Sequence, residues 1–436
     1  MKLDGFSNLL ERMRQEWDGR ARKDAHFYVA FGRRSQTEED FLASAMEVMP
    51  ALQQEFVRLP PATGAERQAL EIGCGPGRLM IQMAPHFGEV QGVDISGEMV
   101  ALARQHLRHL PNAGVHLTSG ADLSMFGDNY FDFVYSYVVF QHIPDQRIVL
   151  NYLSEARRVL KPGGVLRCQI RGTPPLSSEM RLESETWTGC FFSEGEILAF
   201  AREQCFPLVA LSGLDTQYMW TTFRKAVQGS SSYSADRTLV KAVTAASGPR
   251  SHVPNKGRES AVSLWIDGMP DNASLADLSV QFNEVHQAGC YLSPISPCGG
   301  CQLNARLPSG LAPGEYGVKL VAKGQSLPQA HSMTVFAVPW ERPCVTAVTD
   351  GINVTSGLRL ETRTVKVTIE NVGEPGDYSF KVAELPGEYL QYECLDPITS
   401  TYVFAFHLNK RVQSGVRAVT VWKNGEKLTS IDVEVA

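Results

Sequence analysis

The sequence predicts an α/β domain followed by all-β domains. A chain of 436 residues is longer than one hydrophobic core usually supports. Up to about residue 225, short apolar runs alternate with helical patterns, whereas beyond about residue 260 short β-branched and aromatic runs are broken by Gly and Pro. We therefore expect an α/β domain at 1–228, a linker at 229–259, and two β-sandwich modules at 260–340 and 341–436.

The N-terminal half has the rhythm of a mostly parallel sheet flanked by helices. Apolar runs predict strands at 69–73, 89–95, 115–119, 131–140, 165–170, 208–214 and 217–223. Residues 97–110 place their apolar side chains on one helical face, and Ser193 with Glu196 forms a capping-box pattern that opens another helix. This alternation favours helices packed on both faces of the sheet.

The stretch between the halves and the second half itself are rich in turns. Residues 229–234 and 247–250 contain mainly Gly, Ser and Pro with little charge, which predicts a flexible joint. Residues 309–327 resemble residues 414–428, and a spacing of about a hundred residues is typical of one sandwich domain. The sequence thus indicates two similar β modules, the alternative being unrelated β domains that end in similar hairpins.

Charge and hydropathy exclude several classes of partner. The chain has 41 Lys and Arg against 47 Asp and Glu, a net charge of −6, so no domain-wide basic field favours nucleic acid. The first seventeen residues are too charged for a signal peptide, and no apolar run is long enough for a membrane span. We expect a cytoplasmic location without a membrane span or a nucleic-acid partner.

A glycine-rich turn follows the first predicted strand. Gly73, Gly75 and Gly77 stand at alternate positions within Leu70–Arg78. Glycine permits positive φ and lets a ligand approach the backbone at the carboxyl end of a strand. A plain strand-to-helix turn is the alternative, but Asp94 ends the next strand about twenty residues later, where a carboxylate can bond both ribose hydroxyls.

Two further segments extend the pattern towards a nucleoside ligand. The third strand ends at Ser119-Gly120, so that Asp122 or its neighbouring backbone is placed to reach an adenine amino group. Asp132–Ser136 predicts a buried fourth strand, and Leu160–Gly164 is a turn before the fifth. The dinucleotide pattern Gly-x-Gly-x-x-Gly does not match, which disfavours nicotinamide.

Taken together, the series resembles the class I S-adenosylmethionine-dependent methyltransferases, which have a Rossmann-like fold, over roughly residues 15–225. The resemblance implies S-adenosyl-L-methionine as cofactor, with the glycine loop against its methionine part and no metal. Gly120 departs from the family, which often has an acidic residue there. The cofactor-binding residues expected are Glu71, Gly73, Cys74, Gly75, Gly77, Asp94, Ile95, Ala121, Asp122, Leu123 and Tyr28.

His142 is the candidate general base, and Tyr28 is the candidate residue of a lid over the site. The family layout places His142 beside the reactive end of the cofactor, where its pKa suits a general base; a structural role in the loop, or a contact with the cofactor carboxylate, is the alternative. Tyr28 belongs to an N-terminal segment that folds over the cofactor as a lid in similar enzymes, or else to an amphipathic helix on the sheet edge.

The cysteines predict free thiols. Their number is odd and their density low. Cys290, Cys298 and Cys301 lie close in sequence with zinc-like spacing, but a second paired set is missing, so thiols or a local redox bond are favoured over metal.

The sequence of the β modules does not identify the molecule that accepts the methyl group. Residues 307–316 resemble the turn-and-strand ending of bacterial immunoglobulin-like modules, which hold carbohydrate or protein, or act as spacers and dimer surfaces. Aromatic residues for a sugar-stacking face, with core packing as the alternative, are Trp265, Tyr291, Tyr316, Tyr389 and Trp422. We expect a methyltransferase acting on a glycan, glycolipid or polar small molecule, with self-association through the β modules. The rival hypothesis is a scaffold that binds cofactor and partner without turnover.

Overall fold

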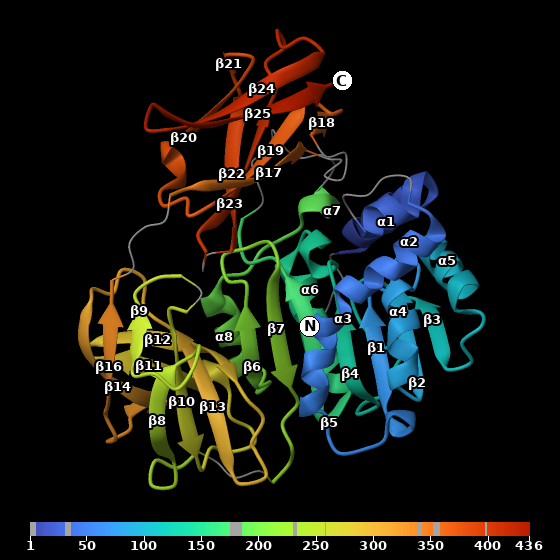
Figure 1. The fold of residues 1–436 in the computed structure, drawn as a ribbon. Coiled ribbons are helices and arrows are strands. Elements are labelled where there is room, and N and C mark those ends of the chain that lie inside the picture. The colour runs from blue at the N-terminus through green and yellow to red at the C-terminus, as the bar shows by residue number, and fades with distance from the viewer. Residues whose placement is uncertain are drawn as a thin grey trace.

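The computed structural model describes residues 6–30, 36–174, 185–229, 233–257, 259–337, 342–351, 358–396 and 399–436. It contains an N-terminal α/β domain and two all-β modules (Figure 1), which confirms the predicted fold class. Within these ranges, no helix combines the length and apolarity needed to cross a membrane.

The N-terminal domain is built on a sheet with the strand order β3-β2-β1-β4-β5-β7-β6. Strands β1 to β5 run parallel, whereas β7 is antiparallel to both of its neighbours. The strands are β1 Gln68–Ile72, β2 Glu89–Asp94, β3 Ala113–Leu117, β4 Phe131–Ser136, β5 Leu160–Ile170, β6 Leu208–Ser212 and β7 Met219–Arg224.

Helices cover both faces of this sheet because each carries an apolar stripe. Buried residues of α3, α4 and α5 form the core on one face, and those of α6 and α8 form the core on the other. The helices are α1 Ser7–Val29, α2 Glu38–Ala43, α3 Met49–Gln53, α4 Arg78–Met83, α5 Gly97–Leu107, α6 Gln146–Val159, α7 Glu185–Thr188 and α8 Glu194–Glu203. Short 3₁₀ turns are η1 Ser44–Glu47, η2 Gln54–Arg58, η3 Gly64–Glu66, η4 Ala84–His86 and η5 Phe140–His142.

Module 1 consists of β8 to β16 and shares its core with the N-terminal domain. Its strands are β8 Leu239–Ala245, β9 His252–Pro254, β10 Ala261–Asp267, β11 Leu278–Phe282, β12 Val285–Leu292, β13 Gly300–Arg306, β14 Gly314–Ala322, β15 Gln325–Ser326 and β16 His331–Phe336, with the turn η7 Leu275–Asp277. Tyr291 of β12 pairs with Ala210 of β6, so module 1 covers the edge of the α/β sheet. A single apolar cluster runs from Phe206 to Leu264 across this junction.

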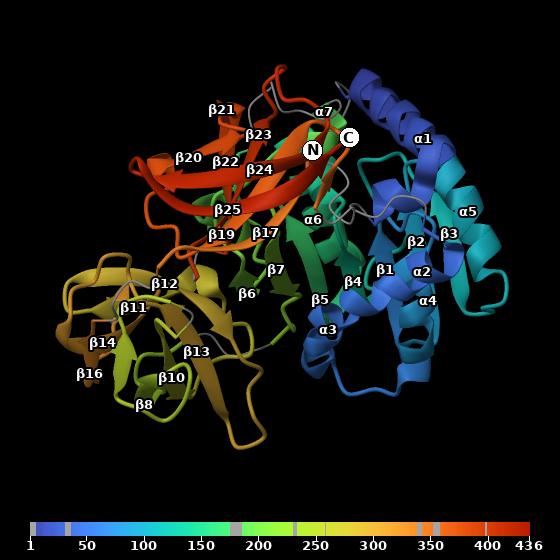
Figure 2. The ribbon, with the colours of Figure 1, turned by 45° about the horizontal axis from the view of Figure 1, so that its top comes forward.

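Module 2 has its own core between two sheets, of order β17-β19-β23-β22 and β18-β25-β24-β20-β21. Its strands are β17 Cys344–Asp350, β18 Arg359–Leu360, β19 Thr364–Glu370, β20 Tyr378–Val382, β21 Leu385–Pro386, β22 Glu388–Asp396, β23 Thr401–His407, β24 Gly415–Lys423 and β25 Glu426–Val435, with the turn η8 Pro375–Asp377. In Figures 1 and 2, module 2 lies over the end of the α/β domain that carries α7.

The expected linker at 229–259 is wrong in part. Strands β8 and β9 fall inside it, and β8 pairs with β10 over Leu239–Ala245. The Ser- and Gly-rich composition predicted a joint, but Val240, Val243 and Ala245 are buried in the shared core. Residues 230–232 and 258 of the predicted linker lie outside the described residues. The other predicted boundaries stay predictions.

A buried ion pair ties module 1 to the N-terminal domain. Arg58 Nε donates to Glu55 Oε2 at 2.7 Å, and Arg58 Nη1 donates to the Leu292 carbonyl of β12 at 2.8 Å. Arg167 Nη1 lies 3.6 Å from the other Glu55 oxygen. The Glu55 and Arg58 side chains are almost fully buried, so removing one partner leaves a desolvated charge.

We predict that Arg58→Met destabilises the protein by about 3 kcal/mol, because Glu55 then keeps only a neutral hydrogen bond from Thr222 at 3.0 Å and the longer ion-pair contact to Arg167. The exposed pair Arg22–Glu98 provides the control, and Arg22→Met should cost less than about 1 kcal/mol. The midpoint of urea unfolding, followed by tryptophan fluorescence, measures both. Equal midpoints for the two variants would contradict the claim that the buried ion pair of Arg58 stabilises the protein more than the exposed pair of Arg22.

Candidate active site

A cavity of about 880 Å³ opens at the carboxyl end of the parallel strands. Its wall combines residues of α1, the glycine loop after β1, the end of β2, and the loops after β3 and β4. Ligands of open α/β sheets bind at this edge. Among the predicted site residues, those that line the cavity are Tyr28, Glu71, Gly73, Cys74, Gly75, Asp94, Ile95 and His142.

The glycine loop is held close to β2 by backbone hydrogen bonds. Gly73 N donates to the Val93 carbonyl at 2.8 Å, and Gly75 N donates to Asp94 Oδ2 at 2.9 Å. Gly73 has φ +75°, and a Cβ there would lie 2.4 Å from a methyl carbon of Val139. Both conformation and space therefore require glycine at position 73.

Asp94 is positioned as an acceptor for ligand hydroxyls. Its Oδ1 also accepts from Ser96 N at 2.9 Å, so each carboxylate oxygen keeps one fixed partner and retains further lone pairs. Burial raises the pKa of Asp94 to about 6, against the opposing effect of the bonds from Ser96 and Gly75. This geometry fits the ribose of an adenosyl cofactor.

Glu71 lies deeper, at the end of β1. Tyr135 donates its hydroxyl to Glu71 Oε2 at 3.0 Å, and burial raises the pKa of Glu71 to about 8. The side chain is therefore mainly protonated at neutral pH when no cationic ligand is near. A cofactor ammonium group at this position would favour the ionised form, which fits the methionine end of the expected cofactor.

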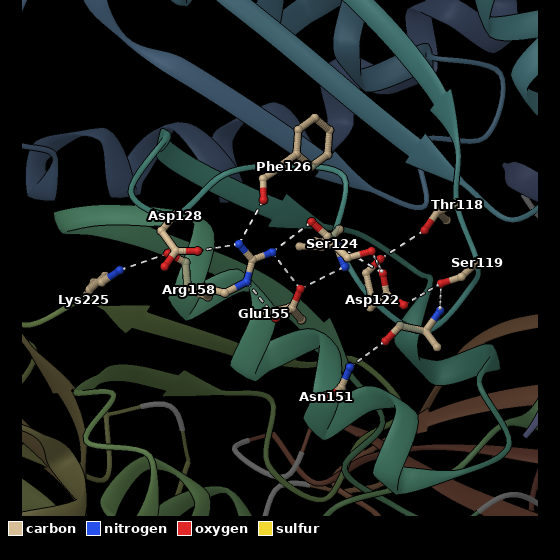
Figure 3. Close-up of polar contacts among 12 residues, drawn as sticks. Thr118, Ser119, Asp122, Ser124, Phe126, Asp128, Asn151, Glu155, Arg158 and Lys225 are labelled. Atoms are coloured by element: carbon tan, nitrogen blue, oxygen red, sulfur yellow. Dashed lines mark hydrogen bonds and ion pairs between the residues drawn. The ribbon is translucent and has the colours of Figure 1, made fainter. Parts of the chain in front are cut away.

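The segment predicted to border adenine lies beside the cavity and not in its wall. Gly120 lines the cavity, whereas Ala121, Asp122 and Leu123 do not. The Asp122 carboxylate accepts from Ser119 Oγ at 3.0 Å and Ser124 Oγ at 2.6 Å, as Figure 3 shows. The residue that faces the cavity is a glycine because a Cβ at position 120 would lie 2.2 Å from Ile95 Cδ1.

Helix α6 fixes this loop from behind, which explains why it turns away from the cavity. Asn151 donates to the Ala121 carbonyl at 2.9 Å, and Arg158 donates to the Leu123 carbonyl at 3.0 Å (Figure 3). Gly77 is likewise absent from the cavity wall: it precedes α4 with φ +82° and packs against Leu107. Its role is to turn the chain into the helix rather than to contact the ligand.

Helix α1 borders the cavity and brings Tyr28 into its wall, at the place that the expected lid would occupy. Asp24, at a kink in α1, accepts from Phe27 N at 3.0 Å and starts a short last segment that directs Tyr28 into the cavity. Asp18 accepts from Ser96 Oγ at 2.6 Å and from Glu98 N at 3.2 Å, which anchors α1 on the first turn of α5. The lid is thus attached to the same loop that holds Asp94.

The sequence analysis did not predict that two tryptophans pack against His142. Trp17 of α1 and Trp187 of α7 lie with their ring centroids 5.4 Å and 4.9 Å from that of His142. Arg20 stacks on Trp17 at 4.7 Å and donates to Thr186 Oγ1 at 2.9 Å, which ties α7 to α1. No local pattern marks Trp187, because α7 is a short helix brought here by packing.

His142 is neutral and has a defined tautomer. Its Nδ1 lies 2.6 Å from the Trp187 carbonyl, which can only accept, so Nδ1 carries the proton and Nε2 the lone pair. Burial, reinforced by the charges of Arg20 and Arg171, lowers the pKa of His142 to about 4. The imidazole is therefore available as a proton acceptor throughout the neutral range.

The three neighbouring cysteines of module 1 do not converge. Cys290 donates to the Asn304 carbonyl at 3.4 Å, Cys298 lies exposed beside Ser296, and Cys301 is buried. In the part of the chain that the structure describes, no three His, Cys, Asp or Glu side chains gather as metal ligands. All nine cysteines are free thiols.

Comparison with known proteins agrees with this geometry. Residues 70–168 match the family model described as "Methyltransferase domain". The ubiquinone biosynthesis O-methyltransferase of Cereibacter sphaeroides (strain ATCC 17025 / ATH 2.4.3) is 29% identical over 153 residues, covering 34% of this chain and 59% of that protein. Phosphoethanolamine N-methyltransferase 2 of Caenorhabditis elegans is 38% identical over 97 residues, 22% of each chain.

A solved structure of similar fold is geranyl diphosphate C-methyltransferase from Streptomyces coelicolor A3(2), with 16% identity, a TM-score of 0.37, and coverage of 50% of this chain and 97% of that one. Within the Rossmann-like N-terminal half, residues 70–168 therefore match a methyltransferase domain, which confirms the predicted class, and the cofactor of that class is S-adenosyl-L-methionine. The chain spans about three fifths of the length of the first curated relative.

We predict that Asp94→Asn weakens S-adenosylmethionine binding by about 1–3 kcal/mol, through loss of hydrogen bonds to the ribose. In the unmodified protein, affinity should fall as pH drops below about 6, because protonation of Asp94 removes an acceptor. Isothermal titration calorimetry measures both effects. Asp128→Asn, at an exposed residue paired with Arg158, is the control, and an Asp94→Asn affinity equal to that of the control would refute the ribose assignment.

Proposed function

We propose that the whole chain is an S-adenosylmethionine-dependent methyltransferase that acts on a glycan, glycolipid or polar small molecule. The observation that carries the proposal is the cavity in which Asp94, the glycine loop and His142 meet at one sheet edge. The names of the relatives, which include a ubiquinone-biosynthesis and a phosphoethanolamine enzyme, support a small-molecule acceptor. We place the enzyme in the cytoplasm, with self-association through its β modules.

The cofactor supplies an electrophilic methyl group on a sulfonium, so the protein need only hold the nucleophile in line and manage its proton. Trp17 and Tyr28 line the cavity, and Trp187 packs against Tyr28 and His142 at its border. His142 Nε2 accepts the proton of an attacking hydroxyl, while the Nδ1 bond to the Trp187 carbonyl fixes the ring. The low pKa of His142 keeps Nε2 unprotonated before the reaction.

The proposed activity is tested by incubating the purified full-length protein with cell extract and S-adenosylmethionine carrying an isotopically labelled methyl group. Mass spectrometry should detect a labelled small molecule that is absent without the protein. The control is the Gly73→Val variant, in which the side chain collides with Val139 and blocks the glycine loop. Cofactor binding without any labelled product would favour a binding scaffold instead.

We predict that His142→Asn lowers kcat by about 10²–10⁴-fold, the usual contribution of a general base, with little change in cofactor affinity. The asparagine amide N–H takes the place of Nδ1–H for the Trp187 carbonyl, so the variant separates proton transfer from loop structure. At saturating cofactor, where protonation of Asp94 no longer limits binding, the pH–rate profile of the unmodified enzyme should lose activity near the low pKa of His142 and not near 6.5. Turnover unchanged by His142→Asn would reduce the residue to a structural role.

A further inference from the structure

A row of polar side chains lies along β5, outside the cavity wall. Arg167, Gln169 and Arg171 alternate along the strand and its end, so they share one face of the sheet. Gln169 and Arg167 are 3% and 4% exposed, yet among the described residues Gln169 Oε1 and Arg167 Nε have no hydrogen-bond partner. Buried polar atoms are normally satisfied, so these groups are aligned for a partner outside the protein.

Module 2 adds a carboxylate to this row. Glu393 of β22 is 7% exposed, and its Oε1 lies 3.7 Å from Arg171 Nη2, beyond hydrogen-bond range. That oxygen also has no hydrogen-bond partner within the described part of the chain. Arg171 directly follows the β5 end residue Ile170, so the ion pair lies at the carboxyl edge of the sheet, the edge at which the cavity opens.

Aromatic rings flank the same path. Tyr137, which lines the cavity, stacks on Trp220 of β7 with centroids 5.7 Å apart. Tyr218 is 41% exposed and interacts electrostatically with both Arg171 and Glu393.

We propose that Gln169, Arg171, Tyr218 and Glu393, called the interdomain cluster, bind a saccharide acceptor between the methyltransferase domain and module 2. The proposal rests on the methyltransferase function proposed above and names its substrate class. A sugar offers hydroxyl donors to the Gln169 and Glu393 oxygens, an acceptor to Arg171, and apolar ring faces to the tyrosines.

Other acceptor chemistries fit the interdomain cluster less well. A quinone ring offers carbonyl oxygens as hydrogen-bond acceptors and only the hydroxyl to be methylated as a donor, so it cannot donate to both Gln169 Oε1 and Glu393 Oε1. A phosphate group would meet Arg171 and Lys366, but it would also face the Glu393 carboxylate at the same point. A neutral polyhydroxylated ring satisfies all three polar groups at once, which makes module 2 part of the acceptor site and no part of the cofactor site.

Saturation-transfer NMR on the full chain, with S-adenosylhomocysteine present, tests this with the methyl glycosides of glucose, galactose, mannose and rhamnose. At least one glycoside should bind, and Glu393→Gln and Gln169→Leu should each weaken it by about tenfold, as expected for a lost hydrogen bond to a buried group. Glu434→Gln, at an exposed position of β25 in the same module, should leave binding unchanged. Calorimetry should show unchanged S-adenosylhomocysteine affinity in all three variants.

The outcomes separate the two proposals. If S-adenosylhomocysteine binds but none of the four glycosides does, or if both cluster variants bind a glycoside as well as Glu434→Gln does, the saccharide site is wrong and the methyltransferase function stands. If S-adenosylhomocysteine itself does not bind, the proposed function fails first. Should Glu393→Gln loosen the domain contact, visible as a lowered Tm, Gln169→Leu on β5 still decides the question because Gln169 belongs to the methyltransferase domain.

Discussion

The site depends on how closely the loop after β1 approaches β2. The bond from Gly75 N to Asp94 joins the two chain segments between which a ligand lies, and the missing Cβ at Gly73 permits that approach beneath Val139. The same carboxylate orders the start of α5 through Ser96, and Asp18 of the lid bonds to the side chain of Ser96. A change in this one contact would therefore affect the loop, the helix and the lid together.

The sequence predicted what local patterns encode. Glycines at alternate positions can only serve backbone conformation, and a carboxylate at the end of the next strand has few other uses, so Gly73, Gly75 and Asp94 were found before their positions in space were known. The alternation of strand and helix likewise predicted the sheet, including the last strand around Trp220.

The rest depends on packing between distant segments, which no local pattern records. Trp187 reaches His142 because Arg20 and Thr186 join α7 to α1, and Glu393 comes from a strand more than two hundred residues further along the chain. Asp122 looked equivalent to a family acid, but the space beside Ile95 allows only glycine in the cavity wall. Strand β8 was hidden in a turn-rich stretch because its partner β10 provides most of its order.

The pairing of β12 with β6 decides where the chain can be shortened. An α/β sheet that ends on β6 presents unpaired N–H and C=O groups, to which a strand of any neighbouring molecule can add. Here the first module supplies that strand and buries the adjoining apolar surface. A chain that ended after β7 would expose the edge of β6 and the apolar surface that module 1 covers, and it would tend to aggregate. Module 1 is therefore needed to complete the sheet. Module 2 has a core of its own and is the part that can be removed.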